Sequence, residues 1–141
     1  MSGLARRGGQ GRENVDTVRG LLGRLASDDP RGMAELLDPE VELVTAKPLA
    51  GAGTFQGQPG FLRWLERWEA AWERESLWIA MVEPVGPRHV VAMVRQRARS
   101  QAPGEGEATV TYMCELRGGL PVRLHAYPSR EEAIAAARAC D

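Results

Sequence analysis

The second half of the chain contains four apolar segments separated by short glycine- and proline-rich turns, and this pattern restricts the folds that it can adopt. The segments are Leu77–Val85, His89–Ser100, Thr109–Leu116 and Pro121–Tyr127. They are rich in large apolar and β-branched residues, and the dipeptides Gly86-Pro87 and Gly118-Gly119 interrupt the pattern between them. Strands joined by such short turns pair with their neighbours along the chain. The sequence therefore predicts an antiparallel sheet.

Helical patterns occupy the first half and the end of the chain. Apolar spacing and capping signals predict four helices, at Glu13–Ala26, Pro30–Leu37, Gln58–Glu75 and Arg130–Ala139. Ser129 and Glu132 match a capping box at the start of the last helix. A further strand is expected at Val41–Ala46, followed by a glycine-rich loop over residues 48–57. The predicted order is α-α-β-α-β-β-β-β-α, which belongs to the α+β class.

The composition fits one globular domain with no nucleic-acid or membrane partner. The chain has 141 residues, of which 43% are apolar, and its formal net charge is −1. A charge this close to zero does not favour nucleic acid or an anionic membrane as a partner. No apolar run approaches the roughly 20 residues that span a bilayer. Residues 1–12 contain four glycines and no apolar run, so we expect a disordered tail at 1–12 and a single domain at 13–141.

Cysteine and histidine usage predicts neither a metal site nor a disulfide framework. The cysteines are Cys114 and Cys140, the histidines are His89 and His125, and no CxxC motif is present. A structural zinc site needs a closer set of such ligands. The cysteines are interpreted as reduced thiols, which predicts a cytoplasmic protein without a metal or other cofactor.

Three of the four tryptophans, Trp64, Trp68 and Trp72, recur every fourth residue in the third predicted helix. On a helix this spacing places them on one face, and burying that face is favourable. The opposite face carries charges of both signs, whereas helices that lie on membranes favour basic residues there. The tryptophans are therefore expected to face the interior, either as core residues or as the wall of a ligand pocket.

Several segments, in this order, resemble the SnoaL-like branch of the nuclear transport factor 2-like superfamily. The resemblance covers Glu13 to Ala137. It is carried by ENVDTVRGLLGRLASDD with LLDPEVEL, by GTFQGQPGFLRWLERW and by LRGGLPVRLHAYPSREEAIAAA. It implies a strongly bent sheet wrapped around helices to form a cone, whose open end commonly admits a small apolar molecule. It also implies a homodimer formed through the convex face of the sheet.

The acidic groups used by enzymes of this superfamily have no counterpart in the sequence. Leu21, Val44 and Tyr112 stand where the similar ketosteroid isomerases place a tyrosine and two aspartates, and Leu21 and Val44 cannot move a proton. Pro128 and Ser129 stand where SnoaL-type cyclases use an aspartate. The inherited aspartate-based mechanism is therefore expected to be absent.

Tyr112 is the first polar candidate that remains. It lies on the apolar face of its predicted strand with Cys114, so its hydroxyl either bonds within the core or donates to a ligand carbonyl. Cys114 is interpreted as a small buried hydrophobe rather than a nucleophile.

Arg95 and His125 are the other catalytic candidates. Arg95 alternates with apolar residues, so it points outward if the apolar face is the inner one. If the strand register is reversed, Arg95 becomes an anchor for a carboxylate or phenolate. His125 is expected on the convex face at a dimer contact with Met113 and Tyr127, and a catalytic role is its alternative.

The leading functional prediction is the binding of a small hydrophobic molecule in the cone. The predicted pocket residues are Trp64, Trp68, Trp72, Met93, Tyr112, Cys114 and Leu124. One alternative is a polyketide-type cyclase, isomerase or hydrolase that uses Tyr112, Arg95 or His125. Another is a non-enzymatic dimerisation or protein-interaction module. A cavity filled by its own side chains would favour the interaction module, an open apolar cavity would favour binding, and convergent titratable groups would favour the enzyme.

Overall fold

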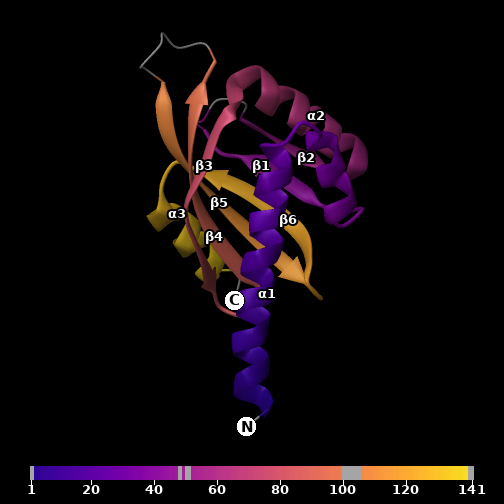
Figure 1. Ribbon diagram of the computed structural model, residues 1–141, viewed down its shortest axis with the longest axis vertical. Coiled ribbons are helices and arrows are strands. Elements are labelled where there is room, and N and C mark those ends of the chain that lie inside the picture. The colour runs from indigo at the N-terminus through magenta and orange to yellow at the C-terminus, as the bar shows by residue number, and fades with distance from the viewer. Residues whose placement is uncertain (1, 48, 50–51, 100–105, 140–141) are drawn as a thin grey trace.

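The computed structural model describes residues 2–47, 49, 52–99 and 106–139, with side chains from residue 9 onward (Figure 1). Six strands form one sheet in the order β2–β1–β6–β5–β4–β3. The strands are β1 Glu42–Thr45, β2 Gly53–Gln56, β3 Trp72–Val85, β4 His89–Ala98, β5 Glu107–Arg117 and β6 Leu120–Tyr127. The helices are α1 Ser2–Leu25, the 3₁₀ helix η1 Pro30–Leu36, α2 Gly57–Ala71 and α3 Arg130–Ala139. The predicted α+β class and the four-stranded hairpin series are confirmed.

The sheet differs from the prediction at its β1 end. Strand β1 pairs with β6 in parallel, although every other pair in the sheet is antiparallel. Residues 53–56, predicted as part of a loop, form β2 because Phe55 pairs with Leu43 of β1 and is buried beside it. Gly57 then adopts a left-handed φ of 71° and begins α2. Glycine adopts this conformation without steric penalty, so the chain turns directly from strand to helix.

Helix α2 ends earlier than the sequence predicts. The predicted helix continues to Glu75, but Trp72 has extended dihedral angles and begins β3, where it pairs with Ala98. Pairing with β4 supplies backbone partners to this segment, and that tertiary contact outweighs its helical pattern.

Helix α1 begins earlier than predicted, at Ser2 instead of Glu13. The glycines that suggested disorder include Gly11, which is buried where α1 meets Pro84 at the end of β3. The next turn of α1 is fixed to the sheet by a hydrogen bond of 3.0 Å from Asn14 Nδ2 to the carbonyl oxygen of Pro87. Gln10 Nε2 donates to Asn14 Oδ1 at 2.9 Å. The contacts of Gly11 with Pro84 and of Asn14 with Pro87 give this part of α1 a tertiary partner that sequence composition does not reveal.

The helices cover the two faces of the sheet unequally. Figure 1 shows α1 crossing one face and α3 lying on the other. The face under α1 and α2 forms the main core, to which β5 contributes Val110, Tyr112, Cys114 and Leu116, as the alternation in the sequence predicts. A smaller core lies under α3, where Met113 and Val91 pack against Ala133 and Ala137. The predicted capping box begins α3, with the Glu132 backbone N–H donating to Ser129 Oγ at 3.2 Å.

Replacing Asn14 by alanine tests how α1 is held on the sheet. Asn14→Ala removes a buried donor and leaves the Pro87 carbonyl without it, so we expect the free energy of unfolding to fall by about 1–2 kcal/mol in urea denaturation. Thr17→Ala is the control, because Thr17 is bonded only within α1, to the carbonyl of Glu13. Its change should stay within about 0.5 kcal/mol. Equal effects of the two substitutions would contradict the role of Asn14.

Candidate functional site

A buried polar network in the interior of the cone joins α2 to the sheet. Trp68 Nε1 donates to Tyr112 Oη at 3.0 Å, and Tyr112 Oη donates to Gln96 Oε1 at 3.4 Å. Burial raises the pKa of Tyr112 to about 12, against smaller opposing effects of the bonds to Trp68 and Gln96. Gln96 Nε2 finds no acceptor among the residues that the structure describes. Tyr112 is therefore a neutral hydrogen-bonding group at working pH and not a base.

The tryptophan stripe fills the space between α2 and the sheet. Trp64, Trp68, Trp72 and Tyr112 expose only 2%, 4%, 5% and 2% of their surfaces, so almost none of their area is within reach of a water molecule. Cys114 and Leu124 belong to the same core. Burial raises the pKa of the Cys114 thiol to about 12, which keeps it protonated and unreactive. These predicted pocket residues form a packed core in the structure rather than the wall of an open pocket.

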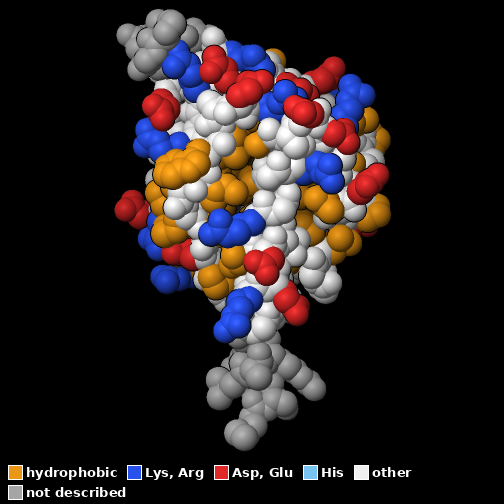
Figure 2. Space-filling view, in the orientation of Figure 1, with side chains coloured by type: hydrophobic (Ala, Val, Ile, Leu, Met, Phe, Trp, Pro, Cys, Tyr) orange, Lys and Arg blue, Asp and Glu red, His pale blue; other side chains and the backbone are white. Residues whose placement is uncertain are grey.

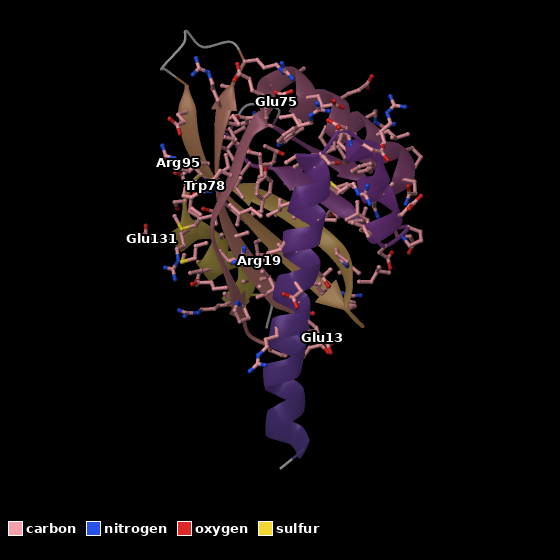
Figure 3. The ribbon with its side chains drawn as sticks, viewed as in Figure 1. Glu13, Arg19, Glu75, Trp78, Arg95 and Glu131 are labelled. Atoms are coloured by element: carbon pink, nitrogen blue, oxygen red, sulfur yellow. The ribbon has the colours of Figure 1, made fainter. Side chains whose placement is uncertain are left out.

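The remaining candidates lie on the other face of the sheet. Ala92 pairs with Tyr112, so the neighbouring Met93 points away from the cone, and the same alternation directs Arg95 outward. Arg95 forms an ion pair of 3.3 Å with Glu107. Figure 3 places its label on the far side of β3 from α1.

His125 is also on the outer face, stacked on Tyr127 with ring centroids 3.9 Å apart. Partial burial, followed by the nearby Arg123, lowers the pKa of His125. Tyr112, Arg95 and His125 therefore do not converge on one position where a substrate could meet all three.

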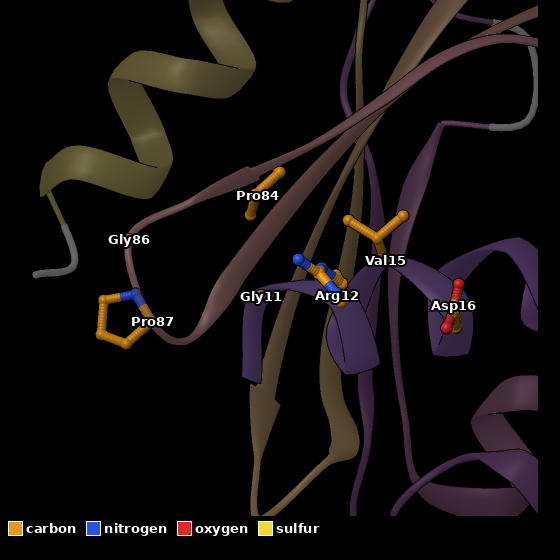
Figure 4. Close-up of a pocket in the computed structure, with 7 residues that line it drawn as sticks. All are labelled: Gly11, Arg12, Val15, Asp16, Pro84, Gly86 and Pro87. Atoms are coloured by element: carbon orange, nitrogen blue, oxygen red, sulfur yellow. The ribbon is translucent and has the colours of Figure 1, made fainter. Parts of the chain in front are cut away.

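An open hollow lies between α1 and the turn that joins β3 to β4. We call it the α1–turn hollow, and it is lined by Gly11, Arg12, Val15, Asp16, Pro84, Gly86 and Pro87 (Figure 4). Its volume is about 730 Å³, and carbon atoms make up most of its lining. The same region appears in Figure 2 as hydrophobic surface beside α1. The sequence pattern did not reveal this hollow, because Gly11 and Arg12 belong to the segment predicted as a disordered tail.

Two classes of site are not found in the part of the chain that the structure describes. Its histidines, cysteines and carboxylates form no group of three or more that could hold a metal ion. None of its helices combines the length and apolar character needed to cross a bilayer.

Solved structures of several proteins share this fold. A nuclear transport factor 2-like protein from Burkholderia thailandensis is 17% identical, with a TM-score of 0.67 over 91% of this chain and 97% of the other. A protein described as a SnoaL-like polyketide cyclase, from Jannaschia, is 15% identical, with a TM-score of 0.67 over 89% and 92%. A protein from Catenulispora acidiphila with a ketosteroid isomerase-like fold, in complex with trimethylamine, is 18% identical, with a TM-score of 0.66 over 84% and 89%.

These likenesses confirm the predicted nuclear transport factor 2-like fold, to which SnoaL-like proteins also belong. At identities of 15–18% they establish the fold alone. No protein-family profile and no curated protein matches the sequence significantly.

Replacing Tyr112 by phenylalanine tests the buried network. Tyr112→Phe leaves Trp68 Nε1 and Gln96 Oε1 without their partner, so we expect the free energy of unfolding to fall by about 1–3 kcal/mol. Trp68→Phe removes the donor of the Trp68–Tyr112 hydrogen bond. The double variant should lose less stability than the sum of the single losses, because both remove the same bond. Additive losses would mean that the Trp68–Tyr112 bond contributes nothing to stability.

Proposed function

We propose that this chain binds a small, mostly apolar molecule in the α1–turn hollow. The observation that carries the proposal is the hollow itself, whose volume of about 730 Å³ falls within the roughly 300–1,000 Å³ of small-molecule sites. Val15, Pro84 and Pro87 offer carbon surface, and a ligand there would remove that surface from water. Among the described residues, the tryptophans in the interior of the cone are packed into the core and expose at most 5% of their surface, so they offer a ligand little contact area.

Binding is favoured over catalysis because the polar groups are dispersed. Tyr112 is enclosed in the core, whereas Arg95 and His125 are on the opposite face of the sheet. General acid–base catalysis requires groups within hydrogen-bond reach of one reacting position. Among the described residues, the lining of the α1–turn hollow includes Arg12 and Asp16 but no histidine, cysteine or tyrosine.

A leucine at Gly11 tests this proposal by occupying the hollow. A β-carbon at Gly11 would lie 3.6 Å from Pro84 Cβ, an ordinary contact, so the larger side chain can extend over the lining. We expect uncharged N-phenyl-1-naphthylamine to fluoresce on binding the wild-type chain and to bind Gly11→Leu at least about tenfold more weakly, since the substitution removes most of the apolar contact.

Gly20→Leu is the matched control, because Gly20 lies on the same helix and a β-carbon there would have no atom within 4 Å. This variant should bind the dye as the wild type does. If both leucine variants bind it equally well, or the wild type does not bind it, the α1–turn hollow is not a binding site.

We further propose that two copies of the chain associate through the part of the outer sheet face that α3 leaves uncovered. Met113, which the sequence predicts as a contact residue, is buried beneath α3. The part of the outer face that remains exposed therefore lies nearer to β3. There, Trp78 is 63% exposed and pairs with Arg95. Met81 and Met93 form the next pair on the same face, beyond the pair of Ile79 with Val94. An exposed tryptophan beside two methionines is typical of an interface, since aromatic residues and methionine are enriched there.

Substituting Trp78 tests this interface. The wild-type chain is expected to sediment as a dimer near micromolar concentration, and Trp78→Lys should shift it to monomer because it places a charge in the contact. Leu62→Lys is the control: Leu62 is 47% exposed, but it belongs to α2 on the other side of the sheet. A monomeric wild type, or dissociation caused only by Leu62→Lys, would contradict the proposed face.

A further inference from the structure

Arg12 lies on the rim of the α1–turn hollow and forms no ion pair with any residue that the structure describes. Several other arginines pair with carboxylates. Arg130, close to the hollow, pairs with Glu83 at 2.6 Å, and Arg123 pairs with Glu42 at 2.8 Å. The hollow is thus an apolar surface bordered by a cation that has charge available for a ligand.

Arg12 and Asp16, one turn later on α1, lie at different distances from the β3–β4 turn. In Figure 4 the Arg12 side chain lies between Pro84 and the helix, whereas the Asp16 carboxylate lies farther along α1, away from the β3–β4 turn. A ligand on Pro84 and Val15 would therefore have Arg12 at its end and Asp16 at a greater distance. An anionic end group would be attracted there, and a guanidinium can form two parallel hydrogen bonds with a carboxylate.

We infer that the ligand of the α1–turn hollow is an apolar carboxylate, whose hydrocarbon part lies on Val15, Pro84 and Pro87 and whose carboxylate pairs with Arg12. The inference rests on the proposed function, because it names the chemical class of molecule for the same hollow. The apolar contacts supply most of the affinity, and Arg12 selects the charge of the end group. Exposed ion pairs are modest in strength, so Arg12 acts as a selectivity residue and not as the main anchor.

Three eight-carbon probes separate charge from apolar binding: octanoate, 1-octanol and octylammonium. Each would be titrated into the isotopically labelled chain while the backbone amide signals of Gly11, Val15 and Gly86 are followed by NMR. Octanoate is expected to shift these signals at the lowest concentration, and 1-octanol to require more. Arg12→Gln should weaken octanoate binding about threefold to fivefold and leave 1-octanol unchanged, as expected for one exposed charge pair.

Arg19→Gln is the control for a general loss of positive charge, because Arg19 is exposed on the same helix and does not line the hollow (Figure 3). This variant should bind octanoate as the wild type does. Equal affinity for octanoate and 1-octanol, or an equal effect of the two arginine substitutions, would overturn the carboxylate assignment while leaving the proposed function intact. Tighter binding of octylammonium would overturn it in favour of Asp16. If no probe shifts the hollow's signals, both the inference and the proposed function fail.

Discussion

The packing of α2 against the concave face of the sheet determines what the cone can contain. Trp68 brings its indole N–H to the Tyr112 hydroxyl in the middle of this face. Trp64, one turn earlier on α2, and Trp72, the first residue of β3, are buried in the same core. Large aromatic side chains contribute much of the apolar burial in such a core, and their polar atoms then need partners within it. The same contacts that hold α2 in place enclose Tyr112 among the described core residues. Opening a pocket at this position would therefore remove aromatic contacts that stabilise the packing of α2 on the sheet.

The candidate site lies at the edge of the cone, between α1 and the β3–β4 turn. Helix α1 continues beyond the core and is fixed to the β3–β4 turn by Asn14, and Gly11 lies beside Pro84. The helix and the turn thus form two walls with open space between them. The proposed binding site therefore shares its α1 wall with the segment that Asn14 attaches to the sheet.

Helix α3 divides the outer face of the sheet into a covered and an uncovered part. Met113 and Val91 lie beneath the alanines of α3, so they belong to a second small core. Trp78 lies beyond the reach of the helix, and its exposed indole is the largest apolar group on the described surface of that region. The alternation of strand residues places these groups on one face, and the length and docking of α3 decide which of them remain available to a second copy of the chain.

The sequence by itself determined the hairpin series, the capping box and the inward direction of Tyr112. Each of these follows from local physics: turn residues break strands, capping residues satisfy helix ends, and side chains alternate across a strand. The alternation of residues left two orientations open for Arg95, and the pairing of Ala92 with Tyr112 is what puts Arg95 on the face opposite Tyr112. Only the tertiary structure decided the rest. Residues 53–56 form a strand because they pair with β1. Helix α2 ends at Ala71 because Trp72 pairs with Ala98 of β4. Gly11 and Arg12 entered the candidate site because Pro84 and Pro87, more than seventy residues away in sequence, pack beside them. Contacts between distant segments are not encoded in any local pattern, so a pocket formed by them becomes visible only when the chain is folded.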